Sequence, residues 1–168
     1  MATTARQSRG SSYLFGSKYL SFAQLSLKGR ALRYLAMREH SRAELITKLG
    51  KHVQEGDDLP AMLDELEAKG FLSAERVMES VIHSKSSRFG AARVAQELRQ
   101  KGLDASLVTE AVERLRGTEH ARAQDIWQRR FSTPAQTPQE RAKQMRFLAS
   151  RGFSGDVVRK VVSCKADD

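Results

Sequence analysis

The side chains of this sequence that are best suited to chemistry are its arginines and lysines, and that chemistry is the binding of oxyanions. Between residues 80 and 101 a single acidic residue, Glu97, accompanies five cations: Lys85, Arg88, Arg93, Arg99 and Lys101. A guanidinium group presents a planar fork of N–H donors that matches phosphate and carboxylate groups. The stretch therefore predicts a surface that binds a polyanion, although it also fits a solvated face that keeps the protein soluble.

The charge of the whole chain is concentrated toward its two ends. The 168 residues carry a formal net charge of +9. Residues 1–30 contain Lys and Arg but no acidic residue, residues 31–117 are balanced, and residues 118–168 again contain an excess of Lys and Arg. A basic surface of this kind attracts nucleic acid or an acidic protein, and the charge alone does not say which.

The groups that usually carry catalysis lack partners in this sequence. Its four histidines are far apart without a second ligand at metal spacing, so we expect them at the surface or in loops: His40, His52, His83 and His120. There is no glycine-rich phosphate loop and no Gly-x-Ser-x-Gly motif. Cys164 is the single cysteine and lies near the end of the chain. We therefore predict a protein that is not an enzyme and needs no metal and no cofactor.

The same composition predicts a cytoplasmic location. One cysteine cannot form a disulfide within the chain, which fits a reducing compartment. No segment approaches the run of apolar residues that a membrane helix needs, and the first residues lack the pattern of a signal peptide. We expect neither membrane insertion nor export.

The elements that must position the basic residues follow a repeated pattern. The segment LRQKGLD at residues 98–104 aligns with LASRGFS at residues 148–154, at an offset of 50 residues. The apolar positions of the next helix repeat at the same offset, and a weaker copy lies upstream around residues 44–50. Self-similarity at a fixed period is typical of repeat proteins. We predict an all-α fold that forms an elongated array of three tandem three-helix repeats.

The repeat pattern also predicts where the units begin and end. We expect a flexible basic N-terminal arm at residues 1–26 and a C-terminal tail at residues 164–168. The three repeats are then residues 27–70, residues 71–116 and residues 117–163. Units of this size are marginal alone because small domains bury a smaller share of their surface. Neighbouring units must therefore support one another.

Local signals mark several helix ends and one core residue. Residues Ser41–Glu44 and Thr137–Glu140 have the spacing of a capping box, and Ser73 and Asp104 are placed to cap further helices. Trp127 shares one helical face with apolar neighbours, so we expect it in the core and not on a nucleobase.

An ordered set of motifs gives the central part of the chain a family resemblance. GFL at residues 70–72 is followed by ER at residues 75–76, then by GAARV at residues 90–94 and QELRQKGL at residues 96–103. In these motifs the sequence resembles the RecX family of bacterial RecA regulators, and the resemblance covers residues 27–163 in the same three-unit order.

The resemblance implies a modulator without enzymatic activity that binds RecA along the groove of the RecA–DNA filament. It would restrain the ATPase, strand exchange and coprotease activities of RecA in recombination, DNA repair and the SOS response. We expect a monomer when the protein is alone. An extended array of helical units could touch more than one RecA protomer. The basic residues that we expect to contact RecA or DNA are Arg76, Arg88, Arg93, Arg99, Lys101, Arg129, Arg130 and Arg151.

Two other functions remain open from the residues alone. Three-helix units and a pI near 10.0 would suit a direct DNA-binding module, although no helix concentrates base-reading side chains. A helical scaffold for another acidic protein fits the charge equally well. The family resemblance favours the RecA regulator. We expect DNA binding by the chain alone to be weak, non-specific and steeply reduced by salt.

Overall fold

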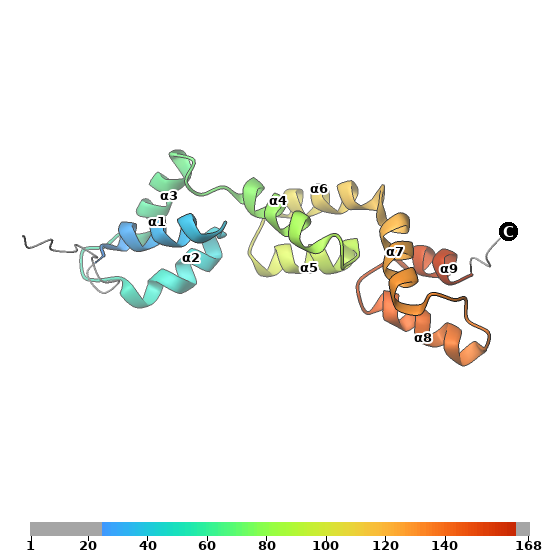
Figure 1. Cartoon of the computed structure of the whole chain (residues 1–168). Coiled ribbons are helices and arrows are strands. Elements are labelled where there is room, and N and C mark those ends of the chain that lie inside the picture. The colour runs from blue at the N-terminus through green and yellow to red at the C-terminus, as the bar shows by residue number, and fades with distance from the viewer. Residues whose placement is uncertain (1–24, 164–168) are drawn as a thin grey trace, which may run out of the picture.

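A computed structural model describes residues 25–163 of the chain (Figure 1). Within this range every regular element is a helix, which confirms the predicted all-α fold. The arm predicted at residues 1–26 lies outside the described residues except for its last two positions, and the predicted tail at residues 164–168 lies outside them entirely.

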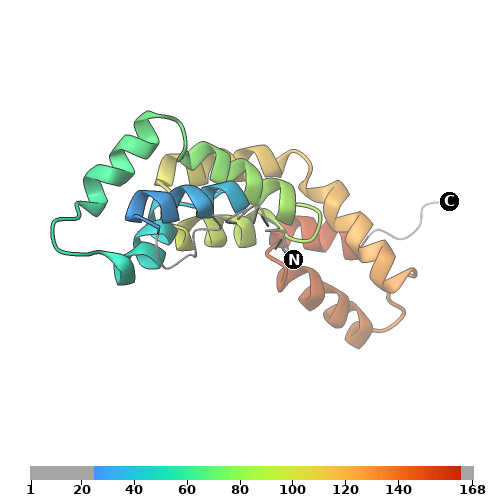
Figure 2. The same cartoon turned by 60° about the vertical axis from the view of Figure 1, so that its left-hand side comes forward.

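The helices form three consecutive groups, which we call the first, second and third units. The first unit contains α1 (Leu27–Met37), α2 (Arg42–Leu49), the short 3-10 helix η2 (Gly50–His52) and α3 (Leu59–Ala68). The second contains α4 (Ala74–Lys85), α5 (Ala91–Gln100) and α6 (Ala105–Arg116), and the third contains α7 (Glu119–Phe131), α8 (Pro138–Ala149) and α9 (Gly155–Ser163). Figures 1 and 2 show the units following one another in an elongated array, as predicted. The unit boundaries given above stay predictions.

Each unit has a hydrophobic core of its own. Leu45, Leu49, Leu63 and Leu66 are fully buried in the first core, and the second is built around residues such as Val94 and Leu98. The third core includes Ala123, Trp127, Leu148 and Val161. Because the cores are separate, the order of the array depends on the contacts between neighbouring units.

The tryptophan lies in the third core, as predicted. Its side chain is 8% exposed, and its Nε1–H donates to Oε1 of the buried Gln144 at 2.9 Å. The hydrogen bond satisfies the only polar atom of the indole, so the residue can pack among apolar neighbours without leaving a buried donor unpaired.

The capping predictions are confirmed in part. At α2 the Ser41 hydroxyl accepts from the Glu44 N–H while the Glu44 carboxylate accepts from the Ser41 N–H, which is a complete capping box. At α8 Thr137 accepts from the Glu140 N–H at 3.2 Å. The Glu140 carboxylate, however, accepts from the N–H of Gln136, one residue earlier than a capping box requires.

One capping prediction is not confirmed, and one histidine is more buried than a loop position suggests. Ser73 caps α4 through its hydroxyl, but Asp104, although it stands at the N-cap of α6, makes no capping hydrogen bond with its side chain. His40 lies in the loop between α1 and α2, one of the two locations predicted for the histidines, but it is buried there, with only 3% of its surface exposed. The ring packs against Tyr34, and its Nδ1 lies 2.9 Å from the Arg38 carbonyl oxygen. Burial lowers the pKa of the imidazole.

The first and second units are held together by ion pairs at what we call the first joint. Arg76 of α4 donates from Nε to Glu39 at 2.8 Å. Lys101, just after α5, donates to the Glu44 carboxylate at 2.8 Å, and both of these side chains are about four-fifths buried. Gly102 (φ 74°) lies against Ala43 so closely that a Cβ on it would lie 3.0 Å from the alanine Cβ.

The second and third units meet through their backbones at what we call the second joint. The N–H of Gly90 donates to the Arg151 carbonyl oxygen at 2.9 Å, and the N–H of Ala92 donates to the Gly152 carbonyl oxygen at 3.2 Å. Gly152 occupies the place that Gly102 has at the first joint, fifty residues earlier in the chain. The same kind of turn therefore docks on the preceding unit at both joints, but hydrogen bonds between backbones replace the ion pairs at the second.

Candidate anion-binding cleft

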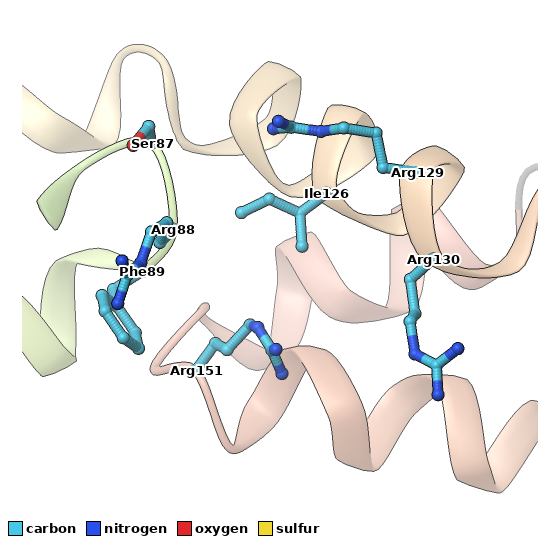
Figure 3. A pocket seen from close by; sticks show the side chains of 7 residues that line it. All are labelled: Ser87, Arg88, Phe89, Ile126, Arg129, Arg130 and Arg151. Atoms are coloured by element: carbon cyan, nitrogen blue, oxygen red, sulfur yellow. The ribbon is translucent and has the colours of Figure 1, made fainter.

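A cleft of about 500 Å³ opens at the second joint (Figure 3). Four arginines line it, and all four were predicted as contact residues from the sequence. None of the described residues that line the cleft is acidic. The lining residues are Ser87, Arg88, Phe89, Ile126, Arg129, Arg130 and Arg151.

Three segments that are far apart in the sequence supply the arginines. Arg88 comes from the loop between α4 and α5, and Arg129 and Arg130 come from the last turn of α7. Arg151 comes from the turn between α8 and α9. In Figure 3 these segments surround the cleft, and the Ile126 side chain of α7 points into it. The cleft therefore belongs to the second and third units together.

Aromatic rings support three of the four guanidinium groups. The distances from the guanidinium carbons to the ring centroids are 3.7, 5.4 and 5.8 Å, for Arg151 over Phe147, Arg88 over Phe89 and Arg130 over Phe131, respectively. Phe131 and Phe147 also pack edge to face, with centroids 5.1 Å apart. A guanidinium that stacks on a ring keeps its N–H donors at the edge of the group, where an oxyanion can reach them.

The charge of the cleft is only partly compensated within the protein. Arg129 forms an ion pair with Asp125, one turn earlier in α7. In the part of the chain that the structure describes, no carboxylate pairs with Arg88, Arg130 or Arg151. Three arginines that line the same cleft without an acidic partner can attract an external oxyanion, which guanidinium groups can hold by charge-assisted hydrogen bonds.

The other four predicted contact residues lie outside the cleft. Arg76 and Lys101 serve the first joint, where each binds a glutamate of the first unit. Arg93 is exposed on α5, where its Nη1 donates to Gln96 at 3.3 Å, and it lines a smaller hollow of about 330 Å³ with Lys101. Arg99 is exposed near the end of α5. The structure thus brings four of the eight residues together in the cleft and leaves the other four outside it.

The glutamate at the first joint is the most strongly perturbed group that faces a predicted contact residue. Burial of the Glu44 carboxyl raises its pKa, but hydrogen bonds from Arg38 and Lys101 outweigh this effect and lower the pKa to about 2. The carboxylate therefore stays charged over the whole physiological range, and Lys101 stays paired with it.

Sequence reasoning missed two residues of α7 that build the cleft. The first is Glu119, whose side chain is 5% exposed. Its Oε1 accepts from the N–H of Ala91 at 3.2 Å, at the start of α5, and its Oε2 accepts from the Ser154 hydroxyl at 3.1 Å, just before α9. The carboxylate thus connects the first turn of α5 to the segment before α9, and negative charge at a helix N-terminus is stabilising.

The second missed residue is Arg122, which joins α7 to the loop that carries Arg88. Its Nη1 donates to the carbonyl oxygens of Ser86 and Phe89, each at 2.8 Å. Its Nη2 donates to the Leu115 carbonyl oxygen at 2.9 Å. Burial lowers the pKa of this guanidinium. The acceptors are backbone carbonyls, so no residue type in the sequence could have indicated them.

From residue 25 to residue 163 there is no group of three or more His, Cys, Asp or Glu side chains that could hold a metal ion. None of the helices in this range is long and apolar enough to span a membrane.

The fold and the cleft together define a helical repeat protein with a cationic cleft between two of its units. Family models described as the first, second and third three-helix domains of RecX match residues 28–57, 75–112 and 118–162, respectively. The chain therefore belongs to the RecX family, as its central motifs indicated.

Relatives over most of the chain agree with this assignment. A protein of Leptothrix cholodnii named "Regulatory protein RecX" is 55% identical over 139 residues, which are 83% of this chain and 88% of the relative. A protein of the same name from Herminiimonas arsenicoxydans is 46% identical over 145 residues, which cover 86% of this chain and 96% of the relative.

Two solved structures share the fold. A crystal structure of regulatory protein RecX matches with a TM-score of 0.68 at 20% identity, over 82% of this chain and 72% of the other. The crystal structure of RecX from Lactobacillus salivarius matches with a TM-score of 0.67 at 18% identity, over 82% of this chain and 92% of the other. Three-helix units in tandem are therefore present in both.

Proposed function

We propose that this protein is a cytoplasmic regulator of RecA that has no enzymatic activity of its own. It binds RecA in the groove of the RecA–DNA filament and mostly inhibits ATP hydrolysis, strand exchange and coprotease activity in recombination, DNA repair and the SOS response. The observation that carries the proposal is family membership, with relatives named "Regulatory protein RecX" that are 55% and 46% identical over most of the chain. RecA as the partner follows from the family resemblance.

The shape and the charge of the molecule support this proposal. Helices of about twelve residues extend roughly 18 Å each, and three units in a row provide a long surface for a repetitive partner such as a filament. The proposed contacts are the arginines of the cleft with Arg93 and Arg99. Arg76 and Lys101 contribute through the first joint, because their side chains already bind Glu39 and Glu44. The protein itself acts as a monomer.

The proposal is tested by the single-stranded-DNA-dependent ATPase of the host RecA, with this protein titrated in at substoichiometric amounts. We expect inhibition by the wild type. The double variant Arg88→Gln/Arg151→Gln loses two cations of the cleft, so about tenfold more protein should be needed, equivalent to about 1.4 kcal/mol. The matched control is Arg116→Gln/Arg146→Gln, which removes two exposed arginines away from the cleft.

Two results would contradict the proposal. If active, filamentous RecA hydrolyses ATP at an unchanged rate with the wild-type protein, the chain does not regulate RecA. If the control variant loses inhibition as strongly as the cleft variant, only the total charge matters and the assignment of contacts to the cleft is wrong.

A direct DNA-binding module is the second candidate, and the arginine cleft is the observation that favours it. Four arginines without an acidic lining residue can neutralise a few phosphates. Because each neutralised phosphate changes the logarithm of affinity by about 0.7–0.9 per decade of salt, a slope of roughly −3 is expected for the chain alone. Fluorescence anisotropy with a labelled single-stranded oligonucleotide at several salt concentrations measures it. Tight, sequence-selective binding at physiological salt would favour this function over RecA regulation.

A further inference from the structure

The two walls of the arginine cleft are hydrogen-bonded to each other. Arg88 and Phe89 lie on one wall and Arg151 on the other. Gly90 directly follows Phe89, and its N–H donates to the carbonyl oxygen of Arg151 itself at 2.9 Å. The distance between the walls is therefore set by backbone contacts of the second joint, and not by the flexible arginine side chains.

This contact leaves no room for a side chain at Gly90. A Cβ at this position would lie 2.2 Å from the Gly152 carbonyl oxygen and 2.4 Å from the Phe153 nitrogen. Both neighbours are backbone atoms, which cannot turn aside as a flexible side chain can. Any larger residue at Gly90 must therefore push the second and third units apart.

Arg122 fixes α7 to the loop that carries Arg88. Its guanidinium donates to the Ser86 and Phe89 carbonyl oxygens, which flank Ser87 and Arg88 in the loop. Arg122 belongs to α7, two turns before Arg129 and Arg130. The hydrogen bonds therefore hold the loop and the helix that carry three of the four arginines in one arrangement.

We infer that the closed second joint makes the cleft a binding site for phosphate-type oxyanions, and that Gly90 and Arg122 are its positioning residues. The ligand is held by Arg88, Arg130 and Arg151, the lining arginines that no described carboxylate neutralises. A preorganised site binds more tightly because less freedom is lost on binding. With the joint open, the same arginines remain charged but act one at a time. The inference deepens the proposed function and rests on it for the source of the phosphate, the DNA of the filament.

The test measures anion binding by the full chain without RecA. Inorganic pyrophosphate is titrated while the ¹⁵N–¹H resonances of the arginine Nε groups are recorded. We expect the signals of Arg88, Arg130 and Arg151 to shift together with one dissociation constant. If they titrate separately, or do not respond, the inference is overturned by the wild type alone.

Two variants then perturb the joint without changing any charge. Gly90→Ala should force the two units apart at the joint. Arg122→Lys keeps the positive charge but loses the guanidinium group that donates to two carbonyl oxygens. Both should bind pyrophosphate at least about tenfold more weakly. Gly117→Ala is the matched control, because Gly117 precedes α7, has φ −59° and has open space where a Cβ would be. The inference would be overturned if either perturbed variant binds pyrophosphate with wild-type affinity while circular dichroism and Trp127 fluorescence show that it is folded.

A comparison of ligands and an assay with RecA separate the remaining outcomes. Tighter binding of hexaglutamate than of pyrophosphate would assign the cleft to carboxylates of a protein partner and would overturn the phosphate assignment. If pyrophosphate binding depends on the joint while the RecA ATPase is unaffected by the wild type, the cleft inference stands and the proposed function fails.

Discussion

Replacing Glu44 by Gln tests how much the charge of this carboxylate contributes to stability, both within the first unit and at the first joint. The Glu44 carboxylate completes the capping box of α2, accepts from Lys101 of the second unit at 2.8 Å, and accepts from Arg38 at 3.0 Å. Glutamine preserves the size of the side chain and removes its charge. The variant therefore weakens two ion pairs while leaving the packing of the joint unchanged.

The expected loss follows from the pKa of this carboxyl. Its pKa of about 2, against 4.5 for the unperturbed group, corresponds to about 3 kcal/mol at 1.36 kcal/mol per pH unit. Since the side chain is 20% exposed and water screens part of this interaction, we expect a loss of about 2 kcal/mol at pH 7. Because the folded pKa lies below the unfolded one, the stabilisation is complete above pH 4.5 or so and disappears as the pH falls toward 2.

The assay is urea denaturation followed by circular dichroism, performed on the wild type and the variant between pH 7 and pH 2. The informative quantity is the difference in unfolding free energy between the two proteins, because other carboxylates, such as Glu65 with its pKa of about 2, contribute equally to both. Glu140→Gln is the control, since this residue helps to cap α8 without a cation of another unit. A difference below about 0.5 kcal/mol, or one that stays constant down to pH 2, would refute the reasoning.

Three further substitutions probe the packing. Gly152→Ala should destabilise by at least about 2 kcal/mol in thermal unfolding, because Gly152 has φ 81° and its Cβ would lie 2.6 Å from the Arg93 nitrogen; Gly50→Ala, in open space, should be neutral or stabilising. Trp127→Phe should cost about 1–3 kcal/mol in urea denaturation, because it removes the donor to Gln144, and Trp127→Leu should cost no less. Leu98→Ala empties a fully buried site and should cost about 2–5 kcal/mol by the same measurement; a smaller loss would show that the second core relaxes around it.

The sequence predicts the helices well because their signals are local. Apolar spacing marks the buried face of each helix, and the Ser41–Glu44 box marks the start of α2 with both of its hydrogen bonds. The repeat was visible because Gly102 and Gly152 follow a cation at the same offset. Both glycines take positive φ at a joint, so the repeated turn was also a signal of the joints, although its docking partners were not predictable.

The cleft itself could be predicted only as a list of cations. Arg88, Arg129, Arg130 and Arg151 were named for their charge, but nothing in the sequence indicated that they meet. Their meeting depends on backbone contacts such as Gly90 to Arg151, across sixty residues. Arg122 escaped notice for a related reason, since a partly buried arginine that binds carbonyl oxygens looks in the sequence like any surface arginine.

The two joints should respond differently to salt, because ion pairs hold the first and backbone hydrogen bonds hold the second. Ion pairs near a surface weaken as salt shortens the Debye length, to about 8 Å at physiological ionic strength and about 3 Å at 1 M. The Arg76–Glu39 pair is partly exposed and is subject to this screening, whereas the Lys101–Glu44 pair is about four-fifths buried and is screened less. The backbone hydrogen bonds from Gly90 and Ala92 carry no net charges for salt to screen. Raising the salt concentration should thus weaken the contact between the first and second units, while the second and third units keep their relative arrangement.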